Sequence, residues 1–193
     1  MNKVIALDIG GVCMQLDPTD LLAALGIRTL EEVTEEMWSI SDLLETGQIS
    51  EREWISVVSG IAPGNLSDDE VCAAWNTMLR YTTPGMFELA QELVEDGYRL
   101  IYFSDTSTIH MREISRKLTF AHLITGGIFS FEVGAKKPGP EMYQAFEEKF
   151  GRPCIYADDR QNNVESGAAK GWSSHLFSTT EKFREAIINA GLL

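Results

Sequence analysis

An aspartate followed closely by two glycines ends the first apolar run of the sequence, Val4–Leu7. The carboxylate of Asp8 could act as a nucleophile or bind a cation. Gly10 and Gly11 would let the backbone approach a ligand closely. Taken alone the pattern is weak, because an aspartate that caps the following turn explains it nearly as well.

Ser104 and Asp105 follow a second apolar run, Leu100–Phe103. The Ser104 hydroxyl could donate a hydrogen bond to an anion. A polar cap before a helix over His110–Leu118 is an equally good interpretation.

A pair of lysines, Lys136 and Lys137, precedes the proline-rich turn at Pro138. A lysine fixed before a stiff turn holds its ammonium group in one direction, which suits a phosphate. Most lysines are simply solvated, so this pattern too is weak by itself.

Adjacent carboxylates, Asp158 and Asp159, follow the apolar run Cys154–Ala157. Two like charges side by side repel each other unless a cation relieves them. Oxygen ligands alone favour Mg²⁺ over zinc. Paired aspartates also cap helices, so the pattern is moderately specific.

The four groups matter as a set, since together they supply a nucleophile, a hydroxyl donor, a fixed cation and a metal site. Phosphoryl transfer needs this combination, because it depends on positioning and on neutralising the charge of the phosphate. The chemistry requires that residues far apart in the sequence meet in space.

The elements between these groups predict how they meet. Continuous apolar runs, extended by His175–Phe177 and a weaker Ile128–Phe131, are typical of parallel strands buried on both faces. Helical patterns at Met86–Glu95, His110–Leu118 and Glu141–Phe150 alternate with them. The sequence therefore predicts an α/β fold, a three-layer, doubly wound parallel sheet with a ligand crevice at the carboxyl ends of its strands.

Residues 16–82 interrupt this alternation and carry only helical signals. Ser50 and Ser67 each begin a capping box. The apolar faces of the predicted helices come from Trp38, Leu43, Leu44, Trp54, Ile55, Val57, Val58, Val71, Trp75, Met78 and Leu79. We call residues 16–82 the helical insert and expect a small bundle over the strand ends, inserted into a core domain of residues 1–15 and 83–193. Its aromatic side chains fill a core more often than they line a binding groove.

The net charge of −13 over 193 residues opposes binding to nucleic acids and to anionic membranes. No cysteine or histidine has the spacing of a metal or redox motif: Cys13, Cys72 and Cys154, and His110, His122 and His175. The apolar run at the N-terminus is too short for a secretory signal, and no stretch is long enough to span a membrane. We therefore expect a cytoplasmic protein with reduced thiols and a small-molecule partner.

The order and spacing of the four groups resemble the motifs of the haloacid dehalogenase superfamily, over nearly the whole chain. The helical insert is similar to the cap of those superfamily members that carry a helical bundle between motifs one and two. Within the superfamily the chain looks like the bacterial sugar-phosphate phosphatases related to α-D-glucose-1-phosphate phosphatase. That group also has Asp-x-Gly in motif one, and the segment 45–50 followed by Trp54 is similar to its cap.

This resemblance implies a hydrolase that attacks a phosphate ester with Asp8 and forms an aspartyl-phosphate. Ser104 and Lys137 would hold the phosphoryl group during the transfer. The same implied phosphate site includes Gly10, Gly11 and Asp105.

The resemblance also implies a Mg²⁺ cofactor. Asp159 would bind the ion directly, together with Asp8 and the main-chain carbonyl of Gly10. Asp158 would support the metal, and Asn163 would orient the acidic loop.

One position departs from the family pattern, because most phosphatases of the superfamily carry a second aspartate where this chain has Gly10. That aspartate is the general acid and base, which is worth roughly 10²–10⁴-fold in rate. Three outcomes follow: a substrate with a good leaving group such as a sugar-1-phosphate, a substitute group or a water near Gly10–Gly11, or a binding protein without catalysis. A second departure is Asp105, where many relatives have asparagine; a role as substitute base is a further option there.

Two other enzyme classes fit less well. A 2-haloacid dehalogenase also uses an aspartate nucleophile but needs no metal, which the pair Asp158–Asp159 argues against. A phosphomutase would need the missing acid in each half reaction.

Overall fold

Five strands form one parallel sheet in the computed structural model, which describes residues 3–193. Met1 and Asn2, which begin the expected core segment 1–15, lie outside the described residues. The sheet order is β5–β4–β1–β6–β7, so the chain starts in the middle and extends to both sides. The strands are β1 (Val4–Leu7), β4 (Arg99–Ser104), β5 (Ile124–Phe129), β6 (Ile155–Asp158) and β7 (Ser174–Leu176). This order confirms the predicted doubly wound sheet and places the ends of β1, β4 and β6 next to one another.

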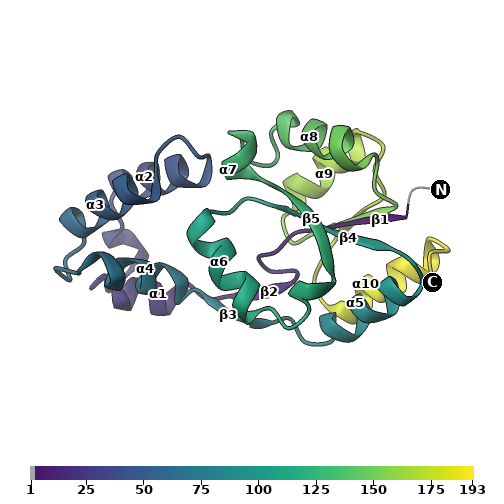
Figure 1. Ribbon diagram of the computed structural model, residues 1–193, viewed down its shortest axis with the longest axis horizontal. Helices are drawn as coiled ribbons and strands as arrows, with labels where there is room; N and C mark the ends of the chain where they lie inside the picture. The colour runs from purple at the N-terminus through teal and green to yellow at the C-terminus, as the bar shows by residue number, and fades with distance from the viewer. Residues whose placement is uncertain (1–2) are drawn as a thin grey trace.

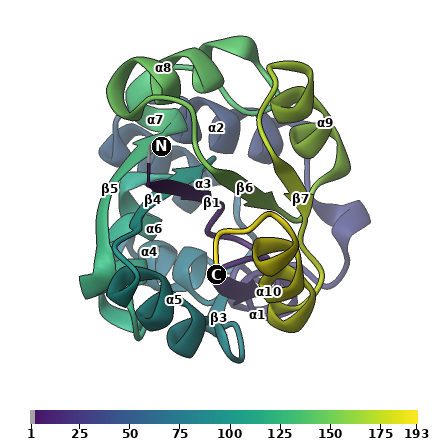
Figure 2. The same ribbon diagram turned by 90° about the vertical axis from the view of Figure 1, so that its right-hand side faces the viewer.

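Helices cover both faces of the sheet, as Figure 2 shows, with α8 and α9 on one face and α5 and α10 on the other. The bounds are α5 (Met86–Glu95), α6 (Thr108–Lys117), α7 (Ser130–Val133), α8 (Pro140–Phe150), α9 (Gln161–Ala169) and α10 (Thr180–Asn189). Successive strand residues alternate between two apolar clusters, with Ile5 and Leu7 in one and Val4 and Ala6 in the other. The strands are therefore buried on both faces, which is the reason for their continuous apolar sequence.

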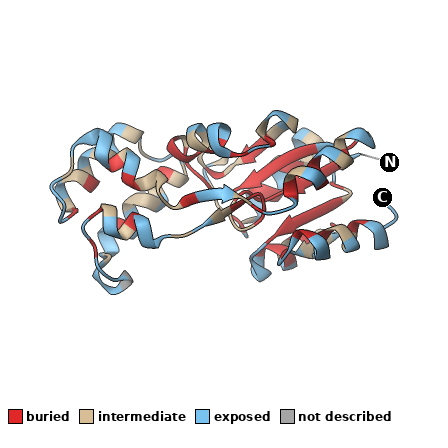
Figure 3. Cartoon of the chain, turned by 90° about the horizontal axis from the view of Figure 1, so that it is seen from below, coloured by how far each residue is buried: buried red, intermediate tan, exposed pale blue. Residues whose placement is uncertain are grey.

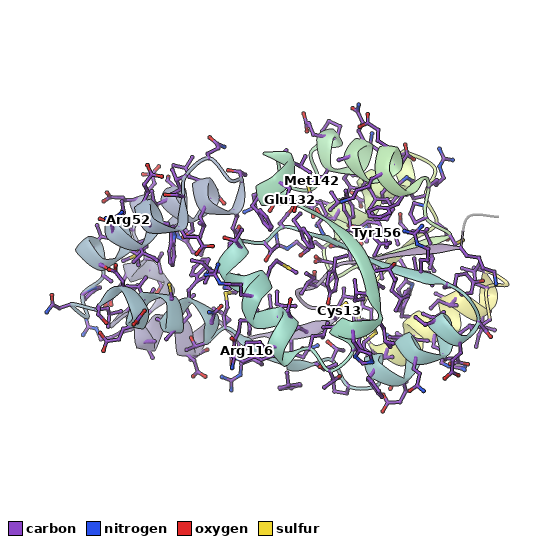
Figure 4. The ribbon with its side chains drawn as sticks, in the orientation of Figure 1. Cys13, Arg52, Arg116, Glu132, Met142 and Tyr156 are labelled. Carbon is purple, nitrogen blue, oxygen red and sulfur yellow. The ribbon has the colours of Figure 1, made fainter. Side chains whose placement is uncertain are left out.

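An aromatic cluster under α8 fixes the neighbourhood of β4 and β6. The ring of Phe103 lies 5.1–5.6 Å from four other aromatic rings, those of Tyr143, Phe146, Tyr156 and Trp172. Tyr156 of β6 and Met142 of α8 lie on this side of the sheet (Figure 4). Such dense packing holds the ends of the two strands rigidly, and these ends carry Ser104 and Asp158.

The helical insert packs around an apolar cluster of its own, beyond the carboxyl ends of the strands (Figure 1). Its helices are α1 (Thr19–Ala24), a 3₁₀ turn (Leu30–Glu32), α2 (Glu35–Glu45), α3 (Glu51–Ile61) and α4 (Asp68–Asn76). Both capping boxes are confirmed, at Ser50 with Glu53 and at Ser67 with Glu70. The division into a core of 1–15 and 83–193 with an insert of 16–82 stays a prediction.

Two secondary-structure predictions are wrong. Leu79–Thr82 is strand β3 rather than helix, and it pairs antiparallel with β2 (Met14–Leu16) to form a two-stranded ribbon. Strand β5 begins at Ile124, four residues before the predicted run at Ile128, and ends at Phe129. Gly126 and Gly127 break the apolar run within β5, because glycine has no side chain to contribute to the pattern.

Not all apolar residues assigned to the faces of the insert are buried. Trp54 is 1% exposed and Val71 is fully buried, whereas Trp38 of α2 is 57% exposed. Figure 3 shows the contrast between the buried strands and the mixed exposure of the insert. Among residues 3–193, no helix is long and apolar enough to cross a membrane.

Candidate active site

Asp8 stands at the end of β1, where the sheet meets the helical insert. Its side chain is almost buried, with the residue 7% exposed. One oxygen, Oδ1, accepts a hydrogen bond from the backbone N–H of Ile9 at 2.8 Å. The same atom lies 3.1 Å from Nζ of Lys137. Burial raises the pKa of Asp8 to about 7, and the nearby Asp158 adds to this, while Lys137 opposes it. The carboxyl group is thus held in one direction by two donors.

Lys137 is the buried cation at the centre of the site. Its Nζ atom lies 2.6 Å from Oδ2 of Asp158 and donates to the carbonyl oxygen of Phe103 at 2.8 Å. Burial works against its charge, but Asp8 and Asp158 outweigh burial and raise the pKa of Lys137. The lysine follows helix α7 and precedes a cis peptide bond to Pro138. Its ammonium group is therefore fixed between two carboxylates.

Asp158 is completely buried and surrounded by donors. Besides Lys137, it accepts from the Tyr156 hydroxyl at 2.5 Å, from the Arg160 N–H at 2.9 Å, and from Nδ2 of Asn163 at 3.1 and 3.2 Å. Asn163 is itself anchored, since its backbone carbonyl oxygen accepts a hydrogen bond from the Tyr143 hydroxyl at 2.7 Å. This network fixes the position of Lys137 and the start of the loop that begins at Asp158 and Asp159.

The carboxylates of Asp8, Asp158 and Asp159 meet at one point, with one oxygen of each within 4.8 Å of the others. Three carboxylates with a single buried lysine leave an excess of negative charge, which a divalent cation would relieve. The donor set consists of hard oxygen atoms, which suits Mg²⁺. Asp158 already accepts from four donors, so Asp8 and Asp159 are the better placed of the three to hold an ion directly.

Gly11 leaves room for the Asp159 carboxylate. Its φ angle is +72°, in the left-handed region, and a Cβ atom at this position would overlap the carboxyl group of Asp159. A side chain at Gly11 would therefore strain the backbone and displace a candidate metal ligand.

We expect Gly11→Ala to weaken Mg²⁺ binding by roughly 10–100-fold, the usual effect of disturbing the residues around metal ligands. Isothermal titration calorimetry with MgCl₂ measures this change. Gly191→Ala is the matched control, since Gly191 also has a positive φ (+70°) but no atom within 4 Å of its added Cβ. Equal Mg²⁺ affinities of the two variants would contradict the placement of Asp159 at the metal.

Two adjoining cavities open at these residues. The inner cavity, about 80 Å³, is lined by Asp8, Gly10, Leu16, Ser104, Asp105, Lys137, Asp159, Arg160 and Asn163. The structure thus brings together the predicted residues of all four sequence motifs. Gly11 and Asp158 lie behind this lining, Gly11 against Asp159 and Asp158 against Lys137.

The outer cavity, about 120 Å³, extends from the same place toward the helical insert. It is lined by Ile9, Gly10, Leu16, Glu45, Met78, Leu79, Ser104, Asp105, Thr106, His110, Ile114, Lys136 and Arg160. Sequence analysis missed Glu45, His110 and Arg160. Lys136 pairs with Glu45 at 2.7 Å and with Asp42 at 2.8 Å, both on α2. No sequence signal could have joined them, because they lie 91 and 94 residues apart.

His110 of α6 also joins the core to the insert. Its ring stacks on Trp75 of α4 with centroids 4.8 Å apart, and its Nε2 atom lies 3.0 Å from the Trp75 carbonyl oxygen. A carbonyl oxygen only accepts, so Nε2 carries the hydrogen. Burial lowers the pKa of His110 to about 4, and the imidazole is neutral at physiological pH.

This buried histidine should make stability depend on pH. Between pH 6.5 and 4 the unfolded chain gains a proton at His110 and the folded chain does not, so unfolding becomes easier by up to about 3 kcal/mol. Above pH 6.5 His110 does not lower the free energy of unfolding in this way, and the loss of stability grows as the pH falls toward 4. Urea unfolding at pH 7 and pH 4 should show a smaller decrease for His110→Phe than for the unchanged protein. Equal decreases would contradict a neutral buried imidazole.

Comparison with known proteins gives one family and several solved structures. A model described as haloacid dehalogenase-like hydrolase matches residues 3–171. A haloacid dehalogenase family enzyme from Bacteroides thetaiotaomicron has a TM-score of 0.82 at 22% identity, covering 95% of this chain and 97% of that chain. Its complex with magnesium and inorganic phosphate gives a TM-score of 0.80 at 22% identity, covering 93% and 96%.

A hydrolase from Porphyromonas gingivalis, described as a predicted member of the same family, has a TM-score of 0.78 at 22% identity, covering 98% of this chain and 97% of that chain. No curated protein sequence matches the chain significantly. Likeness at 22% identity shows a shared fold, and that fold agrees with the sheet and helices described above.

Proposed function

The chain belongs to the haloacid dehalogenase-like hydrolases, and we propose that it is a Mg²⁺-dependent phosphatase that hydrolyses a small phosphate monoester through Asp8. The observation that carries this proposal is the convergence of Asp8, Lys137 and Asp159 on the inner cavity. A nucleophile, a fixed cation and a second carboxylate face the same small space. These are the groups that phosphoryl transfer requires.

Asp8 would attack the phosphorus atom and form an aspartyl-phosphate. Its Oδ1 atom is occupied by Ile9 and Lys137, which leaves the other oxygen for the attack. Lys137 would neutralise the phosphate, and the hydroxyl of the buried Ser104 would donate to a phosphate oxygen. Ser104 ends strand β4, and the ammonium group of Lys137 is held by Phe103 and Asp158, so both groups would bind the phosphoryl group with little rearrangement.

Asp8, Asp159 and the carbonyl of Gly10 would hold Mg²⁺, with Asp158 supporting the site. When bound, the ion neutralises phosphate charge and orients the phosphate for attack. Asp158 would act through Lys137, which it fixes at 2.6 Å. The Bacteroides thetaiotaomicron enzyme with the same fold was crystallised with magnesium and inorganic phosphate, which supports this assignment.

The outer cavity would receive the leaving group. Its lining combines the charged residues Glu45, Lys136 and Arg160 with apolar side chains such as Met78 and Leu79. A small alcohol with several hydroxyl groups and an apolar face fits such a lining. Sugar phosphates have these properties, in line with the resemblance of the sequence to sugar-phosphate phosphatases.

The test is phosphate release from a panel of phosphate monoesters that includes sugar-1-phosphates. Purified protein should release phosphate in the presence of Mg²⁺ and lose this activity in EDTA, with recovery when excess Mg²⁺ is restored. Chloride release from chloroacetate in EDTA would identify a dehalogenase instead. Phosphate binding without turnover of any ester would identify a binding protein, and either result would reject the proposal.

A further inference from the structure

The junction between the two cavities is the place where a phosphate ester would be cleaved. Five residues line both cavities: Gly10, Leu16, Ser104, Asp105 and Arg160. The inner cavity holds the groups proposed to bind the phosphoryl group, and the outer cavity faces the insert. If the proposed function is correct, the oxygen between phosphorus and leaving group lies at this junction, beside Gly10.

Asp105 carries the only carboxyl group among the described residues that line both cavities. The other ionisable group there is Arg160, whose guanidinium does not release its proton. Glu45 lines the outer cavity alone and is paired with Lys136 at 2.7 Å. Asp105 is thus the one residue at the junction that can both give and take a proton.

The backbone holds Asp105 in this position. Its Oδ1 atom accepts a hydrogen bond from the N–H of Lys137 at 2.9 Å, which ties the end of β4 to the loop that carries the buried lysine. No hydrogen bond to Oδ2 is found within residues 3–193, and this oxygen is also not among the buried side-chain atoms without partners. The second oxygen is therefore accessible from the cavities.

We propose that Asp105 is the catalytic acid and base of this protein and takes over the role that Gly10 cannot perform. This assignment rests on the proposed function and concerns the same site. A carboxylate at Asp105 would repel the phosphate of the substrate. A protonated Asp105 that donates its proton would not, which explains why a carboxyl group is found at this position.

The two half reactions balance with this one carboxyl group. In the first, the Asp8 oxygen bonds to phosphorus, the bond to the ester oxygen breaks, and protonated Asp105 gives its proton to that oxygen. In the second, the Asp105 carboxylate takes a proton from water as the water oxygen bonds to phosphorus. The bond from phosphorus to Asp8 then breaks, inorganic phosphate leaves, and Asp105 is protonated again.

The electrostatic setting agrees with this role. Burial raises the pKa of Asp105, while the charge and the N–H of Lys137, followed by Lys136, oppose the effect. An aspartate with a raised pKa keeps its proton to higher pH than an exposed one, which a proton donor requires. The half-buried position also keeps the carboxyl group in contact with the cavities.

The experiment compares esters whose leaving groups differ in basicity. We measure kcat/KM with Mg²⁺ for p-nitrophenyl phosphate, phenyl phosphate and alkyl phosphates, in the unchanged protein, Asp105→Asn and Asp105→Ser. Loss of the acid should lower kcat/KM by roughly 10²–10⁴-fold for alkyl phosphates and by less than about tenfold for p-nitrophenyl phosphate, whose leaving group needs no proton. Asparagine keeps the shape of the side chain and an oxygen that can accept from the Lys137 N–H.

Glu132→Gln is the matched control, a carboxyl-to-amide change at an exposed residue of α7 that lines neither cavity. It should not change the dependence on leaving-group basicity. Glu45→Gln changes the other carboxyl group of the outer cavity, which has no part in proton transfer in this scheme. An equal loss on every ester in both Asp105 variants, no loss on any, or a selective loss in Glu45→Gln instead would overturn the assignment of Asp105. Absence of turnover by the unchanged protein would reject the proposed function and this inference with it, so the two failures are distinguishable.

Discussion

Asp8→Asn should abolish phosphate release, lowering kcat by on the order of 10⁴-fold or more, as removal of a nucleophile does in other enzymes. An amide is a poor nucleophile, and it lacks the negative charge with which Asp8 would share a Mg²⁺ ion with Asp159 in the proposed site. The amide oxygen can still accept from Ile9 and Lys137, so the shape of the site should persist. Steady-state phosphate release on the best substrate of the panel measures the effect.

The same variant should not destabilise the metal-free protein. A carboxyl group whose pKa is raised by burial to about 7 costs stability at pH values above its pKa in the unfolded chain. Removing its charge removes that cost, so the melting temperature at pH 8 should be unchanged or higher. Asp96→Asn, an exposed change at the end of α5, is the control for both measurements. Retention of Mg²⁺-dependent turnover within tenfold of the control would exclude Asp8 as the nucleophile.

The strand ends could be predicted because two simple properties determine them. Apolar runs locate β1, β4 and β6, and parallel strands bring their carboxyl ends to one edge of the sheet. The order β4–β1–β6 makes Asp8, Ser104 and Asp158 neighbours without any knowledge of side-chain contacts. For this reason the sequence located the candidate site as well as the fold.

Contacts between the core and the helical insert could not be predicted in the same way. His110 bonds to the backbone carbonyl oxygen of Trp75, and a backbone group leaves no signal in a sequence motif. Lys136 and Glu45 meet only because α2 lies over the loop that precedes Lys137. The strand Leu79–Thr82 was missed because its four residues, Leu-Arg-Tyr-Thr, are too few to establish a period of two.

Asp158 shows a limit of a different kind. Its sequence position beside Asp159 indicates a metal ligand, and its oxygen atoms do lie near those of Asp8 and Asp159. Three of its four hydrogen-bonding partners lie within five residues of it, but the sequence does not show that their donors point at Asp158, and the fourth, Lys137, is 21 residues away. The motif thus predicts where the carboxylate lies, but it does not show whether the carboxylate binds a metal ion or positions a lysine.

Lys137→Met should have the second largest effect, on both activity and stability. In the proposed mechanism Lys137 is a donor to the phosphate, and its loss should lower kcat by roughly 10²–10³-fold. In addition, Asp8 and Asp158 would lose the cation that lies 3.1 Å and 2.6 Å from them. Breaking a buried ion pair by removing one partner costs about 3–5 kcal/mol of unfolding free energy. Urea unfolding without metal at pH 8 measures this cost.

The destabilisation of Lys137→Met should depend on pH and on Mg²⁺ in a defined direction. Lys137 opposes the effect of burial on the pKa of Asp8, so without the lysine this carboxyl group takes up a proton more readily as the pH falls, which reduces the difference from the unchanged protein. Mg²⁺ should reduce the difference as well, because it compensates the same charges and binds only the folded chain. A cost that is the same at pH 8 and pH 5, with and without Mg²⁺, would mean that lost packing rather than unpaired charge is responsible.

The neighbouring lysine provides the control that decides which of the two serves the site. Lys136 keeps 30% of its side chain exposed and pairs with Asp42 and Glu45 on the insert. Pairs of this kind are worth about 0–1 kcal/mol, so Lys136→Met should cost little stability and show no such dependence on Mg²⁺. A larger loss of stability and turnover in Lys136→Met than in Lys137→Met would reverse the assignment. The buried carboxylates would then have to be balanced by the metal ion alone, and Asp158 could not be the residue that positions the phosphate-binding lysine.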